Sequence, residues 1–208
     1  AGMLQAEDLI LDKDAIYLPP FYHAECGTSR RLRDLAESTG RSLFDGLFDP
    51  SSLTAETGIE YDEVQLAAIR QAVTFKVMVL TGGPGTGKTT TTQGIIAALK
   101  KAGLRVLLAA PTGRAAKRMS EATGMEAKTI HRLLEVEWDK HDRPQFSRNA
   151  RNPLDAQAVI LDELSMVDIT LFSSFLEALP IGCRLVMVGD SDQLPPVGAG
   201  NVLHDMIA

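Results

Sequence analysis

The chain has 208 residues and a formal net charge of −6, with 45% hydrophobic and 23% charged residues. This composition is typical of a globular domain with a sizeable core and excludes a low-complexity chain. The longest apolar runs, at 77–80 and 106–110, are only as long as strands, so no membrane span or membrane partner is expected. The N-terminus lacks the order of a signal peptide, and two distant cysteines fit no disulfide framework. A cytoplasmic location is therefore expected.

Charge is unevenly distributed along the chain. Residues 1–80 carry 7 Lys and Arg against 13 Asp and Glu, whereas residues 100–151 carry 12 Lys and Arg against 6 Asp and Glu. Phosphate binding requires a local basic patch, and a basic protein overall is not needed. The basic segment therefore indicates a local anionic partner, with a solvated charged surface as the alternative.

The first 58 residues are predicted to form a small α+β segment. Residues 8–19 have the pattern of a hairpin that turns at 12–14, and residues 21–38 have the pattern of a helix. Residues 40–58 contain Gly, Ser and Pro and are typical of a connecting stretch. This segment is either the remnant of a preceding domain or a cap on the domain that follows.

From residue 59 onward, short apolar runs alternate with helical patterns. The predicted helices cover 61–73, 88–103, 114–124, 128–136 and 167–180, and the predicted strands cover 76–80, 104–110, 156–163 and 183–190. Val64, Ala68 and Ile69 indicate the apolar side of the first helix. Strands that are apolar throughout and are separated by helices predict an α/β domain with a parallel sheet flanked by helices.

A phosphate-binding loop lies between the first of these strands and the next helix. Gly82 precedes Gly87, Lys88 and Thr89 by the spacing G-x-x-x-x-G-K-[ST]. Glycines allow backbone N–H groups to converge on a phosphate, and the following helix presents its N-terminus. We expect Lys88 to reach the β- and γ-phosphates of ATP and the Thr89 hydroxyl to bind Mg²⁺. The candidate cofactor-binding residues here are Gly83, Pro84, Gly85, Thr86, Gly87, Lys88, Thr89 and Thr90.

Acidic and amide side chains follow two later strands. Asp162 and Glu163 end one apolar run, and Gln193 comes shortly after another. We expect Asp162 to hold Mg²⁺ together with Thr89, and Glu163 to act as general base on the attacking water. An acidic helix cap is the alternative for this pair. The Gln193 amide can donate to a γ-phosphate oxygen and accept from a water. Lys88, Glu163 and Gln193 are therefore the candidate catalytic residues.

The basic segment contains two helix starts that would present hydroxyls, N–H groups and cations to a nucleic-acid backbone. The candidate nucleic-acid-binding residues there are Pro111, Thr112, Arg114, Thr129, His131 and Arg132. For His131, a capping or core histidine is the alternative. Two short strands in 135–151 are predicted to form a β-hairpin, on which Trp138 would either stack on bases or pack against the domain.

In sequence order, these motifs resemble those of superfamily 1 DNA helicases, and most closely the RecD-like branch. Six stretches between residues 61 and 200 carry the resemblance: "YDEVQLAAI", "GGPGTGKTT", "APTGRAA", "TIHRLL", "LDELSMVD" and "VGDSDQLPPVGAG". The resemblance implies a RecA-like P-loop NTPase domain over 59–208, with Gln65 as the residue that reads adenine. It also implies that the hairpin at 135–151 is similar to the pin that splits duplex DNA.

The resemblance further implies the activity and the partners. ATP hydrolysis would drive 5′–3′ movement on single-stranded DNA, with ATP and Mg²⁺ as cofactors and a recombination or repair complex as a partner. In this family a second RecA-like domain supplies an arginine to the ATP site, and the motifs of that domain are not found in this sequence. We therefore expect a first motor domain that binds nucleotide and hydrolyses it slowly. A module that binds DNA or protein in a nucleotide-dependent way without translocation is the alternative.

Overall fold

The computed structural model describes residues 9–38, 43, 48–49, 51–138 and 144–208. Within these residues, five parallel strands form the central sheet. Their order is β3 (Val77–Thr81), β9 (Arg184–Gly189), β8 (Ala158–Leu161), β4 (Val106–Ala110) and β5 (Ala127–Thr129). The α/β class and the parallel sheet expected from the sequence are confirmed.

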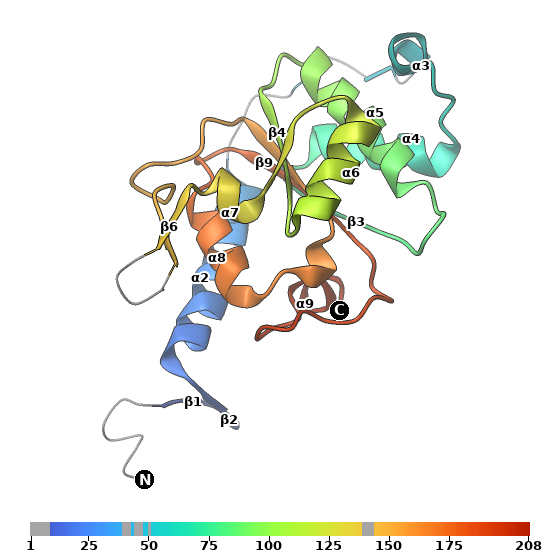
Figure 1. Ribbon diagram of the computed structural model, residues 1–208. Helices are drawn as coiled ribbons and strands as arrows, with labels where there is room; N and C mark the ends of the chain where they lie inside the picture. The colour runs from blue at the N-terminus through green and yellow to red at the C-terminus, as the bar shows by residue number, and fades with distance from the viewer. Residues whose placement is uncertain (1–8, 39–42, 44–47, 50, 139–143) are drawn as a thin grey trace.

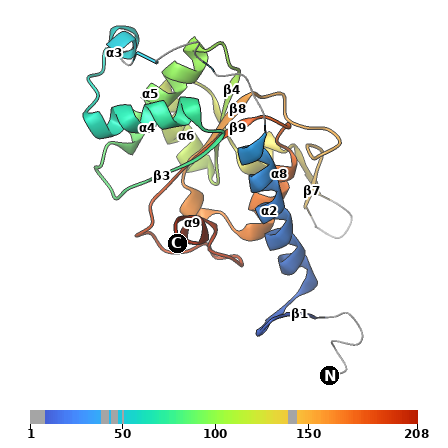
Figure 2. The ribbon, with the colours of Figure 1, turned by 180° about the vertical axis from the view of Figure 1, so that it is seen from behind.

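Helices cover both faces of this sheet (Figures 1 and 2). One face carries α3 (Ser51–Thr57), α4 (Glu63–Thr74), α5 (Lys88–Lys101) and α6 (Gly113–Thr123). The other face carries α2 (Pro19–Glu37), α7 (Ile130–Leu133), the 3-10 turn η1 (Leu164–Met166), α8 (Ile169–Glu177) and α9 (Val202–Ile207). None of the helices in the described part of the chain has the length and hydropathy needed to cross a bilayer.

Side chains of the central strands alternate between two cores. In β8, Ala158 and Ile160 pack towards α4 and α5, whereas Val159 and Leu161 pack towards α2 and α8, and all four are fully buried. Strand β9 alternates in the same way. Burial on both sides explains why β8 is apolar at every position and why β9 is apolar from Leu185 to Val188, with no polar alternation in the sequence.

Three local predictions differ from the structure. Residues 127–129 form the edge strand β5, which pairs with β4, and the helix predicted over 128–136 is reduced to Ile130–Leu133. Helix α3 forms within the stretch 40–58, because Leu53 is fully buried against the α4–α5 side of the sheet. Val64 is 79% exposed, since it lies about 140° around α4 from the buried Ile69. Propensity and spacing alone do not contain these tertiary contacts.

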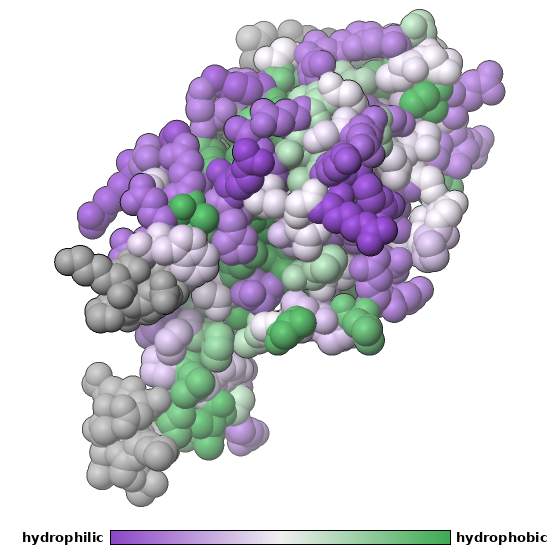
Figure 3. Space-filling model, viewed as in Figure 1, coloured by the Kyte–Doolittle hydropathy of each residue, from purple (hydrophilic) through white to green (hydrophobic). Residues whose placement is uncertain are grey.

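The N-terminal helix packs on the α/β core. Leu35 of α2 is buried in the same cluster as Phe172 and Phe175 of α8. The packing fits a cap on the core, and both interpretations of this segment and the boundary between residues 58 and 59 stay predictions. The strands β1 (Ile10–Asp12) and β2 (Ala15–Tyr17) pair as a hairpin ahead of α2. Figure 3 shows apolar side chains gathered there.

A second hairpin lies beside α7. Strands β6 (Val136–Trp138) and β7 (Pro144–Phe146) pair antiparallel, with Trp138 opposite Pro144. Residues 139–143 lie outside the described part of the chain.

Arg31 provides a test of how α2 is attached. Its Nε donates to the Leu176 carbonyl oxygen of α8 at 3.2 Å, and its Nη2 donates to the carbonyl oxygen of Leu179, which follows α8. Because hydrogen bonds from a charged donor are lost, we expect Arg31→Ala to lower the free energy of unfolding by about 1–3 kcal/mol. Urea unfolding followed by circular dichroism measures this change. Arg33→Ala, at an exposed position of the same helix, is the control, and equal stability of the two variants would contradict the docking.

Candidate nucleotide and DNA sites

Parallel strands place most of the candidate residues along one edge of the sheet. β3 leads into the phosphate loop, β8 leads into Asp162, and β9, which lies between them, leads into Asp190. A cavity of about 580 Å³ opens at this edge. Its lining includes the predicted residues Gly83, Pro84, Gly85, Thr86, Gly87, Lys88, Thr89, Asp162, Glu163 and Gln193. The structure thus brings the three candidate catalytic residues and the two candidate metal ligands into one cavity.

Two candidate cofactor-binding residues, Gln65 and Thr90, are not among the lining residues. The Gln65 side chain accepts from Asp62 N–H at 3.1 Å, while the Asp62 side chain accepts from Gln65 N–H at 2.8 Å. This capping box begins α4. A Cβ on Gly87, whose φ is +80°, would lie 2.5 Å from Gln65 Nε2. Gln65 therefore lies against the phosphate loop from outside the cavity, and its role as adenine reader stays a prediction.

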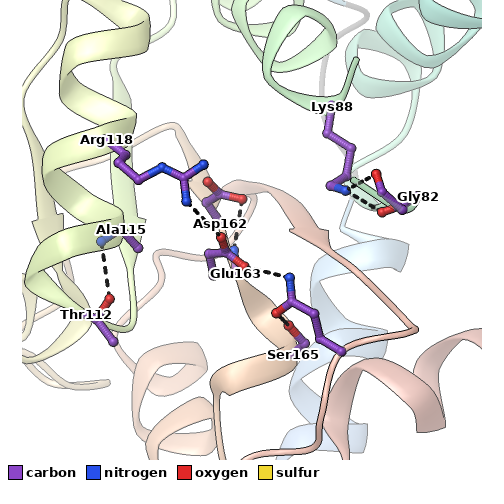
Figure 4. A network of polar contacts seen from close by, with 10 residues as sticks. Gly82, Lys88, Thr112, Ala115, Arg118, Asp162, Glu163 and Ser165 are labelled. Carbon is purple, nitrogen blue, oxygen red and sulfur yellow. Dashed lines mark hydrogen bonds and ion pairs between the residues drawn. The ribbon is translucent and has the colours of Figure 1, made fainter. Parts of the chain in front are cut away.

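The phosphate loop is closed by its own polar contacts. The Thr86 hydroxyl donates to the Gly83 carbonyl oxygen at 2.9 Å. A side chain at Gly82 has no room, because a Cβ there would lie 2.6 Å from Thr86 Oγ1. The Lys88 ammonium donates to the carbonyl oxygens of Gly82 and, at 2.8 Å, of Gly83 (Figure 4). These acceptors are neutral, so an anionic phosphate would be the stronger partner for the ammonium.

Asp162 is a half-buried acid whose carboxylate oxygens suit a hard cation. Burial raises the pKa of its carboxyl, and the adjacent Glu163 charge raises it further. The Glu163 N–H, which donates to Asp162 Oδ1 at 2.9 Å, and the charges of Arg118 and Lys88 lower this pKa. Thr89 lines the same cavity. One hydroxyl and one carboxylate fit Mg²⁺, which takes hard oxygen ligands and keeps several waters and phosphate oxygens.

Both oxygens of the Glu163 carboxylate face donors from other elements. Gln193 Nε2 donates to Oε2 at 3.4 Å, and Arg118 Nη1 lies 4.0 Å from Oε1. The Ser165 hydroxyl donates to Gln193 Oε1 at 3.0 Å. Glu163 has a φ of +55°, which is uncommon for a residue with a side chain. Although it occupies the N-cap position of η1, its side chain makes no capping hydrogen bond, so the geometry does not favour the helix-cap alternative for Glu163.

Helix α6 forms a wall of the cavity that sequence analysis did not predict. Its lining residues are Ala115, Arg118, Met119, Ala122 and Thr123. They recur with the spacing i, i+3, i+4, i+7 and i+8, which places them on one face of a helix. This spacing was the sequence pattern from which a shared lining face could have been predicted. The other unpredicted lining residues are Thr92, Val188, Gly189 and Asp190.

The candidate DNA-binding residues lie at the neighbouring strand ends. Because Ala110 of β4 pairs with Thr129 of β5, α6 and α7 both begin at the same edge of the sheet. Thr112 Oγ1 accepts from Ala115 N–H at 3.2 Å and caps α6. Pro111 directly precedes this capping residue. Thr129 caps α7 in the same way, accepting from Arg132 N–H at 3.2 Å. The side chains of Arg114 and Arg132 are exposed on this edge.

The remaining two DNA candidates differ in exposure. The His131 ring is half-buried, and its centroid lies 6.0 Å from that of Phe146 in β7. His131 therefore packs against the hairpin without being a core or capping residue, and its role in DNA binding stays a prediction. Trp138 in β6 is 63% exposed, so its ring is open to a partner.

Comparisons with known proteins agree with this architecture. Residues 65–199 match a family model described as an AAA domain. The chain is 38% identical over 204 residues to the ATP-dependent RecD2 DNA helicase of Deinococcus radiodurans, a match that covers 95% of this chain and 27% of that protein. It is 42% identical over 168 residues to the RecBCD enzyme subunit RecD of Mycolicibacterium smegmatis, covering 70% of this chain and 30% of that one.

A solved structure gives the same result. The Pif1 helicase from Candida albicans matches with a TM-score of 0.50 and 26% identity, over 67% of this chain and 34% of that chain. The chain therefore spans about 30% of the length of the relatives that it matches. Together with the RecA-like fold and the ordered motifs, these matches show that the chain belongs to the AAA-domain family and to the RecD-like branch of superfamily 1 helicases.

Proposed function

We propose that this chain is an ATP-binding motor domain of a DNA helicase that moves on single-stranded DNA. The observation that carries the proposal is the shared cavity, in which Lys88, Asp162, Glu163 and Gln193 converge. Helix α6 borders that cavity and carries the exposed Arg114 in its first turn, so one helix borders both the candidate nucleotide site and the candidate DNA site. The two sequence relatives are named as a DNA helicase and as a subunit of RecBCD enzyme.

In the proposed reaction, Lys88 and the N–H groups of the phosphate loop bind the β- and γ-phosphates of ATP. Thr89 and Asp162 would hold Mg²⁺, which neutralises charge on the phosphate oxygens. Glu163 accepts a proton from the water that attacks the γ-phosphorus. Gln193, which contacts Glu163 at 3.4 Å, orients that water and the terminal phosphate.

The starts of α6 and α7 would contact the DNA backbone, and the hairpin β6–β7 would stack on bases or part the duplex. We propose 5′–3′ movement, action within a recombination or repair complex, and a cytoplasmic location. Hydrolysis by this chain alone would be slow, because family members complete the ATP site with an arginine from a second RecA-like domain.

Substitution of the phosphate-loop lysine tests nucleotide binding. We expect Lys88→Ala to weaken Mg-bound AMP-PNP, an ATP analogue that is not hydrolysed, by about tenfold or more, since a charge-assisted contact to phosphate is lost. Isothermal titration calorimetry measures the affinity. The control, Lys101→Ala, removes an equal charge from the opposite end of α5. Unchanged affinity in Lys88→Ala would refute the nucleotide site.

Arg114 tests the backbone contact with DNA. We expect Arg114→Ala to weaken binding of labelled oligo(dT) and to reduce the salt slope by about 0.7, as expected for one lost phosphate contact. Fluorescence anisotropy at several salt concentrations measures both quantities, and AMP-PNP affinity should not change. Lys101→Ala again serves as the control. The DNA site is wrong if the two variants bind DNA equally.

Trp138 offers a direct readout because it is the one tryptophan of the sequence and is 63% exposed. If a base stacks on its ring, oligo(dT) should quench its fluorescence and protect it from acrylamide. Trp138→Leu should then weaken DNA binding by about 1–3 kcal/mol. DNA binding with no change in tryptophan emission would show that the hairpin does not contact single strands.

A further inference from the structure

One cation in the nucleotide cavity has no part in the proposed reaction. Arg118 lies on the cavity face of α6, and its Nη1 is 4.0 Å from Glu163 Oε1. Figure 4 shows its side chain directed at the Asp162–Glu163 pair, with Lys88 on the other side of that pair. The acidic pair therefore lies between two cations that belong to different elements.

The position of Arg118 corresponds to the terminal phosphate of a bound triphosphate. A general base must lie within hydrogen-bond reach of the water that it activates, and that water attacks the γ-phosphorus. A guanidinium beside Glu163 is consequently close to the γ-phosphate end of the cavity. Lys88, by contrast, contacts the loop that would hold the β-phosphate as well.

The contact with Glu163 is one that a phosphate can replace. The Arg118 side chain is 73% exposed, and 4.0 Å is long for an ion pair, so the pair contributes little stability. A phosphate group offers more charge and a geometry that matches the planar fork of a guanidinium. Loss of the contact between Arg118 and Glu163 therefore costs little free energy, and the contact between Arg118 and phosphate that replaces it is stronger.

We propose that Arg118 binds the γ-phosphate and leaves Glu163 when ATP enters the cavity. Two consequences follow for the reaction. Arg118 distinguishes ATP from ADP, because ADP lacks the phosphate that it contacts. Its departure also frees Glu163 Oε1 to accept from the attacking water. This inference rests on the proposed function, since it assumes that the cavity binds ATP.

The test compares the binding of two nucleotides to the unsubstituted chain and to five variants. Isothermal titration calorimetry on this chain gives the affinities for Mg-bound AMP-PNP and Mg-bound ADP. We expect Arg118→Ala to weaken AMP-PNP by about tenfold, and ADP by less than about twofold, since a charge-assisted contact to the γ-phosphate is lost. Arg118→Lys should retain part of the preference, because lysine keeps the charge and loses the fork.

Lys117→Ala is the matched control. Lys117 is the preceding cation on α6, is 78% exposed and pairs with Glu121 at 3.8 Å, outside the cavity lining. Its removal should leave both affinities unchanged. The high exposure of both side chains means that neither variant should unfold the chain, which thermal melting checks.

A double-mutant cycle tests the exchange itself. Glu163→Gln removes the competing charge, so AMP-PNP should bind about threefold more tightly relative to ADP, the range expected for a weak exposed ion pair. In the Arg118→Ala background this gain should disappear. Persistence of the gain would mean that simple repulsion between Glu163 and phosphate is responsible, and it would overturn the exchange.

The outcomes separate the two levels of inference. If the unsubstituted chain binds neither nucleotide, the proposed function fails. If it binds both but Arg118→Ala weakens them equally or not at all, the cavity is correct and the role of Arg118 is wrong.

Discussion

The parallel backbone ladder of β3, β9, β8 and β4 is the constraint on which the site depends. Parallel pairing points every strand in the same direction, so the residues that follow each strand meet at one edge of the sheet. Lys88, Asp162 and Gln193 are separated by 74 and 31 positions in the sequence, yet they line one cavity for this reason. Strands β8 and β9 are buried on both faces, and this burial fixes their register. A slip of one residue would move each side chain from one core into the other.

Helix α6 connects the two halves of the proposed function. Its N-terminal turn, capped by Thr112, stands at the edge where β4 and β5 end and where Arg114 is exposed. One turn further along, Arg118 faces Glu163. A helix of 11 residues that packs on β4 and β5 moves as a unit. A displacement of the end that carries Arg114, where we propose that DNA binds, would therefore also change the distance between Arg118 and Glu163.

The sequence predicted the elements that have strong local signals. The glycine spacing of the phosphate loop, the apolar strands and the Gly124 end of α6 are local patterns, and each appears where it was expected. Strand β5 was missed because its three residues, "AKT", gain strand geometry only by pairing with β4. Arg118 was missed because its contact with Glu163 joins residues 45 positions apart. Such contacts are decided by the packing of α6 over the sheet, which no local pattern encodes.

The segment that carries Gln193 is fixed at both ends. At one end, Asp190 is buried and its Oδ1 accepts from Asp192 N–H at 3.0 Å. At the other end, Gly198 packs so closely on Asp168 that a Cβ would lie 2.6 Å from Asp168 Cβ, and Asp168 caps α8. Any displacement of Gln193 therefore has to be absorbed between these two anchors. Leu194 and Val197 lie in that stretch, and their side chains are highly exposed. A rearrangement that changes the contact between Gln193 and Glu163 therefore changes the surface of the protein before it changes the core.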